Sequence, residues 1–369
     1  MQLGHSSTIT RNHLRHVSML TTLCIAAAML NSLVGCATAM YSGYDAYQEQ
    51  DYASALQTWQ PLAEEGDAKA QYFVGSMYDE GTGVPQDHVE AVKWYVMAAQ
   101  QGHPRAQHAL GVKYEKGEGV AQDFNQAAAW YERAALQGLA SAQHNLGLLY
   151  VSGKGVQQDF TKARHWFQLA ADQSTAESQF TLGWMLDTGR GSSSDKKEAA
   201  RWIRLAAEQG LPAAQAYFGS MYVEGAGVPQ DFQEAAAWTS RAANQGLAVA
   251  QYDLSLMHLR GQGVPRDQSE AFKWMQLAAE QNLPAAQTKL GMMYEHGRGV
   301  SQDKVAAYMW YTIAASHSEA QAQSKRDSLK DKLTAEEVEL AKQRSDEWRA
   351  AHPTTSQSTA PLRPLPAAD

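Results

Sequence analysis

Apolar residues recur along this chain as short stripes at helical spacing, separated by polar turns that contain glycine. In residues 67–102 the first stripe consists of Ala70, Val74, Met77, Tyr78 and Gly81. The second stripe, which follows a turn, consists of Ala91, Trp94, Tyr95, Ala98 and Ala99. Because positions three and four apart share one face of an α-helix, this stretch predicts two helices that pack through their apolar faces.

The turns indicate where each helix ends and the next begins. Gly81 follows the first stripe, where a left-handed residue commonly terminates a helix. Asp87 precedes the second stripe and can accept hydrogen bonds from free backbone amides as an N-cap. At five of the seven equivalent positions a glutamate or glutamine three residues later, such as Glu90, can complete a capping box. Pro104 then opens the next helix at a position that tolerates proline.

The whole pattern repeats every 36 residues. Tryptophan recurs at positions 94, 130, 166, 202, 238, 274 and 310. Aspartate, glutamine and a glycine pair keep the same step, starting from Asp87, Gln71 and Gly81/Gly83. Fixed periods of this size are typical of solenoids, in which each unit buries its apolar face against its neighbours. We therefore predict an all-α, right-handed superhelical solenoid of helix-turn-helix repeats, with the tryptophans in its core.

These residues resemble the Sel1-like repeat, a relative of the tetratricopeptide repeat. The second unit shows the pattern nearly whole, with Ala106, Leu110, Gly111, Tyr114, Gly117, Val120, Asp123, Ala127, Trp130, Tyr131 and Gly138. The resemblance covers seven units over residues 67–318. It implies a non-catalytic scaffold for a protein or peptide partner, with adaptor roles in bacterial envelope assembly, exopolysaccharide secretion or host interaction.

The segments beside the array are expected to close its ends. Residues 44–66 look like a partial leading repeat. Residues 319–350 are predicted to form polar capping helices, the last of which opens with a capping box between Thr334 and Glu337. The proline-, serine- and threonine-rich residues 351–369 are expected to be a disordered tail.

The N-terminal segment has the layout of a secretory signal, with a positively charged start, a short apolar run and small residues after it. Residues 1–35 are therefore predicted to be a signal peptide and residues 36–43 a linker. Leu33-Val-Gly-Cys36 resembles the bacterial lipobox, which implies lipidation of Cys36 and an outer-membrane location facing the periplasm or the surface. Cleavage after Ala39, giving a soluble periplasmic or secreted protein, and an uncleaved membrane anchor remain alternatives.

Charge and cysteine content exclude several classes of function. The formal net charge of −8 offers no basic footprint for nucleic acid. Both cysteines, Cys24 and Cys36, precede the repeats, so the array has neither a disulfide nor a thiolate metal site. The glycine pairs follow helices rather than strands, which is wrong for a dinucleotide turn. We predict no metal and no cofactor.

The variable positions of each unit lie on one face of its first helix, opposite the constant apolar stripe. In related solenoids the first helices line the concave docking surface. We predict that a partner binds there, through Tyr72, Phe73, Arg105, His108, His144, Phe180, Trp184, Tyr217 and Tyr252.

Two sets of residues on this face suggest more specific roles. Trp184 is the only tryptophan of the seven full units outside the 36-residue ladder, and tryptophan is enriched in interface hot spots. Partner contact is our hypothesis for it, and local packing is the alternative. His108 and His144 occupy equivalent positions in adjacent units. They could converge on a metal ion, but two solvent-facing histidines are the simpler expectation.

An enzyme is the main competing class. Some cysteine-rich relatives of the Sel1-like family were assigned penicillin-binding or β-lactamase activity, but they carry a cysteine pair in each repeat and this chain has none. A serine-enzyme pattern, Ser301-Gln-Asp303-Lys304, does occur, on a turn where Asp303 already serves as an N-cap. A surface protein that binds a host receptor is a third possibility.

Repeat four departs from the pattern. Ser174 replaces the connecting glycine, Leu186 replaces the tyrosine, and Ser192 replaces the valine after the second glycine. Since the turn has lost its apolar plug, we predict a local softening or bend near residues 172–195.

Overall fold

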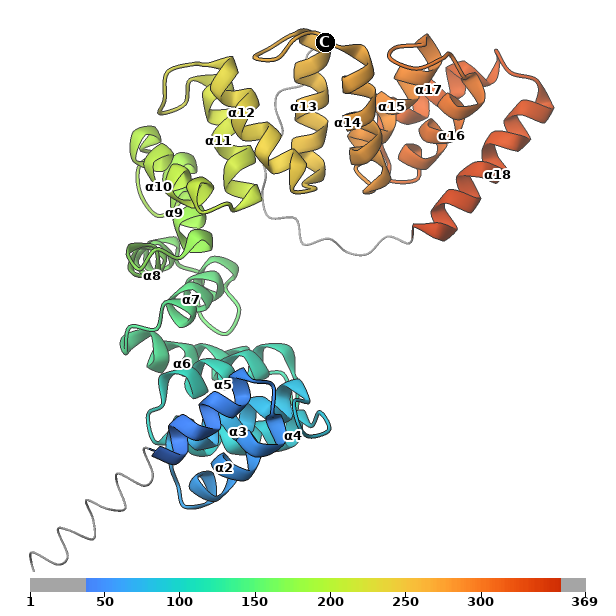
Figure 1. The fold of residues 1–369 in the computed structure, drawn as a ribbon. Helices are drawn as coiled ribbons and strands as arrows, with labels where there is room; N and C mark the ends of the chain where they lie inside the picture. The colour runs from blue at the N-terminus through green and yellow to red at the C-terminus, as the bar shows by residue number, and fades with distance from the viewer. Residues whose placement is uncertain (1–37, 353–369) are drawn as a thin grey trace, which may run out of the picture. The chain divides into compact units, whose positions relative to one another are not determined.

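The computed structural model describes residues 38–352, and all regular structure in this range is α-helical (Figure 1). The chain divides between Gln158 and Asp159 into two compact units, here called unit 1 and unit 2. The predicted signal peptide, Cys36 and residues 353–369 lie outside the described residues.

Each unit is a stack of helices. Unit 1 contains a helix at residues 38–48, α2 (Tyr52–Glu64), α3 (Ala68–Glu80), α4 (His88–Gln100), α5 (Pro104–Lys116), α6 (Phe124–Leu136) and α7 (Ala140–Ser152). Unit 2 contains α8 (Phe160–Asp172), α9 (Ala176–Thr188), α10 (Lys196–Glu208), α11 (Pro212–Glu224), α12 (Phe232–Asn244), α13 (Ala248–Arg260), α14 (Gln268–Glu280), α15 (Pro284–His296), α16 (Lys304–Ala315), α17 (Ala320–Lys330) and α18 (Ala335–Ala351). Consecutive helices are in contact from α2 to α7 and from α8 to α17, and α18 contacts α16. The described chain is an all-α repeat solenoid, as the period predicts.

The helix ends follow the predicted turn chemistry. Gly81 terminates α3 in the left-handed conformation, with φ of 72°. The carboxylate of Asp87 accepts hydrogen bonds from the amides of Val89 and Glu90 at 2.9 and 3.0 Å. The same arrangement recurs at each equivalent aspartate from 123 to 303, although Asp303 caps only the Ala306 amide.

The predicted capping boxes within the repeats are wrong. A capping box needs a free amide on the N-cap residue, but the Asp87 amide donates instead to the carbonyl of Tyr78 at 2.8 Å. Glu90 therefore turns outward and pairs with Lys93 at 2.6 Å. The box of α18 is confirmed: the Thr334 amide donates to Glu337 at 2.8 Å, and the Glu337 amide donates to the Thr334 hydroxyl at 3.2 Å.

The core differs in one respect from the expectation. Trp202, Trp238 and Trp310 are buried, but the other four tryptophans of the ladder are only half-buried at the edge of the helix pair. The residue directly after each tryptophan lies deeper. These residues are all buried, and they are Tyr95, Tyr131, Phe167, Ile203, Thr239, Met275 and Tyr311.

A buried glutamine joins each repeat to the preceding one. The Gln71 side chain donates to the Ala63 carbonyl at 3.0 Å, near the end of α2. Its side-chain oxygen accepts a hydrogen bond from Gln101 at 2.8 Å. Equivalent bonds to the preceding helix recur from Gln107 to Gln287. Because the last carbonyls of a helix have no partner within it, the recurring glutamine satisfies one of them at every junction.

The predicted linker at residues 36–43 is wrong over its described part, because a helix already begins at residue 38. Met40 and Tyr47 pack against the cluster around Trp59, which stacks on Phe73 with ring centroids 4.5 Å apart. Gly43 faces the Trp59 ring so closely that a Cβ would overlap it. Residues 38–48 and α2 thus form a complete leading helix pair rather than a fragment.

At the C-terminus, α17 and α18 form the predicted pair of end helices, and α18 packs on α16 through Val338 and Ala341. Ala351, predicted as the start of the tail, still belongs to α18. In the described part of the chain, no helix is both long and apolar enough to cross a membrane.

Repeat four keeps its helices but changes the contacts that hold its turn. Ser174 adopts φ of 64°, the left-handed region that the equivalent Gly138 and Gly210 occupy without a Cβ. The Ser194 hydroxyl donates to the Asp187 carbonyl at 2.9 Å, which takes the place of the bond that a glutamine such as Gln86 makes in other repeats. The Lys196 ammonium pairs with the Asp187 carboxylate at 2.8 Å.

We expect residues 172–195 to exchange backbone amide hydrogens about five to thirty times faster than residues 208–231, which are the equivalent segment one repeat later. A serine in the left-handed region costs about 1–2 kcal/mol, and this cost lowers the free energy of local opening. Hydrogen–deuterium exchange of the intact chain measures both segments in one sample. Equal protection would contradict the prediction.

Candidate interaction surface

The predicted contact residues all lie on the first helix of their repeats, but they differ in burial. Three of them, Phe180, Tyr217 and Tyr252, are 7%, 3% and 6% exposed and offer little area to a partner. The Tyr217 hydroxyl donates to the buried Asp187 carboxylate at 2.7 Å, and Tyr252 belongs to the core around α13 and α14. These residues are buried although they lie on the variable face, because the neighbouring repeat covers them.

Three other predicted residues come together. Tyr72, Phe73 and Arg105 line a cavity of about 770 Å³ in unit 1, which we call the aromatic groove. One side is formed by residues 38–48, and the other by the N-terminal halves of α3 and α5. The full lining consists of Met40, Tyr41, Tyr44, Asp67, Ala68, Lys69, Tyr72, Phe73, His103, Pro104 and Arg105.

Five of the eleven residues that line the groove carry aromatic rings. Tyr72 stacks on His103 with ring centroids 5.0 Å apart, and it contacts Phe73 at 5.4 Å. Tyr41 and Tyr44, one turn apart on the N-terminal helix, are 72% and 47% exposed. Exposed aromatic rings gathered beside half-buried ones are typical of a protein or peptide contact surface.

His108 and Trp184 lie outside the groove. His108 is half-buried rather than solvent-facing, and its Nε2 atom lies 3.2 Å from the side-chain amide of Asn145 in the next repeat. Burial lowers the pKa of His108. His144 is also half-buried. Trp184 is partly exposed in unit 2, and the Arg190 guanidinium lies 4.5 Å from its ring centroid.

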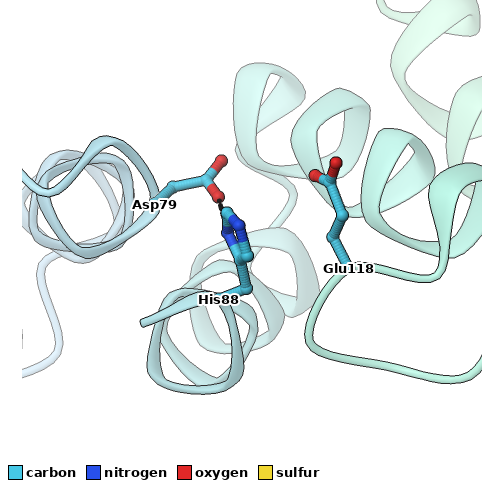
Figure 2. Close-up of side chains that lie close together, drawn as sticks. All are labelled: Asp79, His88 and Glu118. Carbon is cyan, nitrogen blue, oxygen red and sulfur yellow. Dashed lines mark hydrogen bonds and ion pairs between the residues drawn. The ribbon is translucent and has the colours of Figure 1, made fainter. Parts of the chain in front are cut away.

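Unit 1 also contains a cluster of side chains of the kind that bind metal ions, which the sequence pattern did not indicate. Asp79, His88 and Glu118 lie close enough together to be read as a cation site, as Figure 2 shows. The His88 Nδ1 atom is 2.7 Å from an Asp79 oxygen. However, the ammonium of Lys113, whose side chain is only 5% exposed, pairs with Asp79 and lies 2.7 Å from Glu118 and 3.4 Å from His88 Nδ1. Lys113 supplies the positive charge that the carboxylates require, so we assign this cluster a structural role in joining α3, α4 and α5.

A second feature that the sequence pattern did not indicate links two positions of each repeat: the residue two places before the first glycine of the turn, and the residue directly after the repeated tryptophan. In three repeats the first position is acidic and accepts a hydrogen bond from a tyrosine hydroxyl at the second. The Tyr131–Glu115 and Tyr311–Glu295 pairs are 2.7 and 2.8 Å apart, and Tyr95–Asp79 is 3.4 Å. Where this residue is aliphatic, the partner has no phenol; these combinations are Val151 with Phe167, Val223 with Thr239, and Leu259 with Met275. In repeat four the acidic residue is Asp187, but the residue after the tryptophan is Ile203, which has no hydroxyl. Asp187 accepts its hydrogen bond from Tyr217 of the next repeat instead.

The serine-enzyme pattern has an ordinary structural explanation. Ser301 is exposed in the turn before α16, and the Asp303 carboxylate accepts a hydrogen bond from the Ala306 amide at 2.9 Å. Lys304 is the exposed first residue of α16. These three residues serve as a turn and an N-cap, as they do in the other repeats.

Comparison with known proteins agrees with the repeat pattern. A family model described as the Sel1 repeat matches residues 68–103, 104–139, 140–174, 176–211, 212–247, 248–283 and 284–318. A solved Sel1 repeat protein from Oxalobacter formigenes is 35% identical, with a TM-score of 0.63, and the match covers 80% of this chain and 86% of that one. A protective antigen present in uropathogenic Escherichia coli strains, which displays an SLR fold, is 31% identical over 81% of this chain and 80% of its own, with a TM-score of 0.40. No curated protein matches.

The repeat fold is that of a helical scaffold, a class generally used for protein–protein interaction. The chain belongs to the Sel1 repeat family. Proteins built from this repeat are generally non-catalytic scaffolds, which agrees with the structural roles found above for the turn aspartates and for Lys113.

Proposed function

We propose that this protein is a non-catalytic adaptor of the bacterial cell envelope that binds a protein or peptide through exposed side chains of its first helices. The observation that carries the proposal is the aromatic groove, where Tyr72, Phe73 and Arg105 meet the exposed Tyr41 and Tyr44. Interfaces are enriched in tyrosine, tryptophan and arginine, and these residues supply most of the binding energy when they are buried by a partner.

The envelope location rests on the N-terminal sequence. We propose that Cys36 is acylated after removal of residues 1–35 and that the lipid tethers the scaffold to the outer membrane. Each buried methylene of an acyl chain contributes about 0.8 kcal/mol, so several chains hold a protein firmly. Metabolic labelling with an alkyne fatty acid, followed by membrane fractionation, tests this: label should be lost in Cys36→Ser, and unlabelled wild type would favour cleavage after Ala39.

We expect Trp184→Ala to weaken partner binding about tenfold or more, because truncating a hot-spot tryptophan typically costs 2 kcal/mol or more of binding energy. The measurement is photo-crosslinking in intact cells, followed by affinity determination with the purified partner. Circular dichroism should show an unchanged helical content.

Trp130→Ala is the matched control, since Trp130 is also half-buried with an arginine on its ring, Arg133 at 4.3 Å, but lies on a second helix. Equal affinities for Trp184→Ala and wild type would remove Trp184 from the contact surface. Failure to crosslink any protein or peptide, with nitrocefin hydrolysis by the purified chain, would replace the scaffold with the enzyme alternative.

A further inference from the structure

The aromatic groove carries positive charge in a protein whose formal net charge is −8. Lys69 and Arg105 are exposed at its edge, and within residues 38–352 neither forms an ion pair. Asp67 is the only acidic residue in the lining, and its carboxylate accepts a hydrogen bond from the Ala70 amide at 2.8 Å as the N-cap of α3. The groove therefore offers two unpaired cations beside apolar rings.

The N-terminal ends of two helices add to this positive potential, and both cations act on His103. Burial lowers the pKa of His103, and the neighbouring charges of Arg105 and Lys69 lower it further, whereas the Asp67 carboxylate acts in the opposite direction. The His103 Nδ1 atom accepts a hydrogen bond from the Ala106 amide at 3.3 Å, which fixes the ring against Tyr72. Helices α3 and α5 both begin at the groove, and the N-terminal end of a helix bears partial positive charge.

Among the seven repeats, two cations occur beside an aromatic pair only at the N-terminal end of the array. The position of Lys69 is occupied in successive repeats by Lys69, Arg105, Ser141, Glu177, Ala213, Val249 and Ala285. Only the first two are cations, and they lie on the first helices of two consecutive repeats, α3 and α5, in one groove. The position pair of Tyr72 and Phe73 becomes His108 and Ala109 in the next repeat, so the aromatic pair and the two cations coincide only at the N-terminal end of the repeats.

We propose that the aromatic groove binds a peptide segment in which an aromatic or aliphatic side chain is flanked by carboxylates. The apolar side chain of the segment packs between Tyr44 and Tyr72, and its carboxylates meet Lys69 and Arg105. Charge complementarity selects this partner over a basic or a purely apolar segment, because an uncompensated cation buried under an apolar partner would lose hydration without a replacement. The inference rests on the proposed function and specifies its partner.

The test uses the full chain and a designed peptide, Gly-Glu-Phe-Leu-Glu-Gly, carrying a neutral fluorophore. Its counterparts replace both glutamates with glutamine or with lysine. Fluorescence anisotropy at low ionic strength gives the dissociation constants, since exposed charge pairs are screened by salt. We expect the acidic peptide to bind at least about fivefold more tightly than the glutamine peptide, as two exposed ion pairs allow.

Paired variants separate the groove from the rest of the surface. Lys69→Gln with Arg105→Gln should weaken binding of the acidic peptide by about fivefold to tenfold and leave the glutamine peptide unaffected. Lys93→Gln with Arg133→Gln removes the same charge from exposed positions on second helices and should change binding less than about twofold. Tyr44→Ala, a change at an exposed ring, should weaken both peptides.

Several outcomes would overturn the inference: equal binding of the acidic and glutamine peptides, equal loss in the two charge variants, or no binding of the acidic peptide up to about 1 mM. The proposed function fails separately. If a partner crosslinks in the cell envelope and its affinity is unchanged by Lys69→Gln with Arg105→Gln, the scaffold function stands and only the groove chemistry is wrong.

Discussion

Replacing Gly227 with alanine is expected to destabilise unit 2 by about 2–5 kcal/mol, whereas Gly225→Ala should cost roughly 1–2 kcal/mol. Both glycines belong to the turn between α11 and α12, and both have positive φ, 74° and 70°. A Cβ at either position therefore pays the cost of the left-handed conformation. The difference between the two arises from what the added Cβ would meet.

Gly225 has room for a side chain, because the nearest neighbour of an added Cβ is the Gln230 Cβ at 3.5 Å. At Gly227 the added atom would overlap the backbone carbonyl of Lys196, the first residue of α10 in the preceding repeat. A carbonyl at a helix end cannot move without moving the helix, so the two repeats must separate. Overpacking of this kind costs about 1–3 kcal/mol in addition to the backbone strain.

Urea unfolding followed by circular dichroism measures both variants, with hydrogen–deuterium exchange to localise the loss, because repeat arrays do not always unfold in one step. Exchange in Gly227→Ala should increase at the junction of α10 with α11 and α12. Equal destabilisation by the two substitutions would show that the backbone conformation alone explains the glycine pair.

The second glycine illustrates what a repeat pattern can and cannot reveal. The 36-residue period predicts the helices, and the stripe-ending glycine and following aspartate predict where they end, because these are local preferences of the backbone. Gly227 is constrained by a contact with residue 196, in another repeat. Its recurrence is visible in the sequence, but the reason is a close approach between repeats that only the packed structure contains.

A residue that recurs unchanged in every repeat is not always the most deeply buried one. Trp94 recurs without change and was expected inside, yet it is half-buried, and the variable Tyr95 behind it is nearly inaccessible. A position can vary and still be buried when its neighbours vary with it. The pairing of Glu115 with Tyr131, and of Val151 with Phe167, was readable in the sequence by comparing positions 36 residues apart.

The candidate site was predictable only in part. Tyr72, Phe73 and Arg105 were identified from the variable face, and the structure places them together. The other wall of the groove comes from residues 38–48, which we read as linker and the start of a partial repeat, since the segment lacks the turn glycines and the full stripe of a repeat. Phe180, Tyr217 and Tyr252 were assigned to the same face, but helical spacing does not tell how far the next repeat covers them.

Substitutions in the Glu115–Tyr131 pair should couple strongly. Glu115→Val leaves the Tyr131 hydroxyl buried without its acceptor and should cost about 1–3 kcal/mol. Tyr131→Phe should cost less, about 1 kcal/mol, because the half-buried Glu115 can still reach water. The double variant reproduces the natural Val151–Phe167 combination, so we expect it to be more stable than the sum of the single losses by about 1–2 kcal/mol.

The same pair predicts an alkaline limit to stability. Burial, and after it the hydrogen bond to the Glu115 carboxylate, raises the pKa of Tyr131 above its usual value, and burial with the charge of Asp79 does the same for Tyr95. Because the pKa of each buried tyrosine is raised in the folded state, its contribution to the free energy of unfolding is complete below about pH 10, the pKa of tyrosine in the unfolded chain. This contribution is lost as the pH rises further. Each tyrosine should cost unit 1 about 1.4 kcal/mol per pH unit above that point.

Urea unfolding at pH 8, 10 and 11 tests this limit. From pH 10 to 11, Tyr131→Phe should lose about 1 kcal/mol less than wild type, since it has one fewer buried phenol to ionise. Tyr41→Phe, at a ring that is 72% exposed, should follow wild type, because it removes no buried phenol. Parallel losses in all three proteins would mean that lysine deprotonation, which they share, sets the alkaline limit instead of the buried tyrosine–carboxylate pairs.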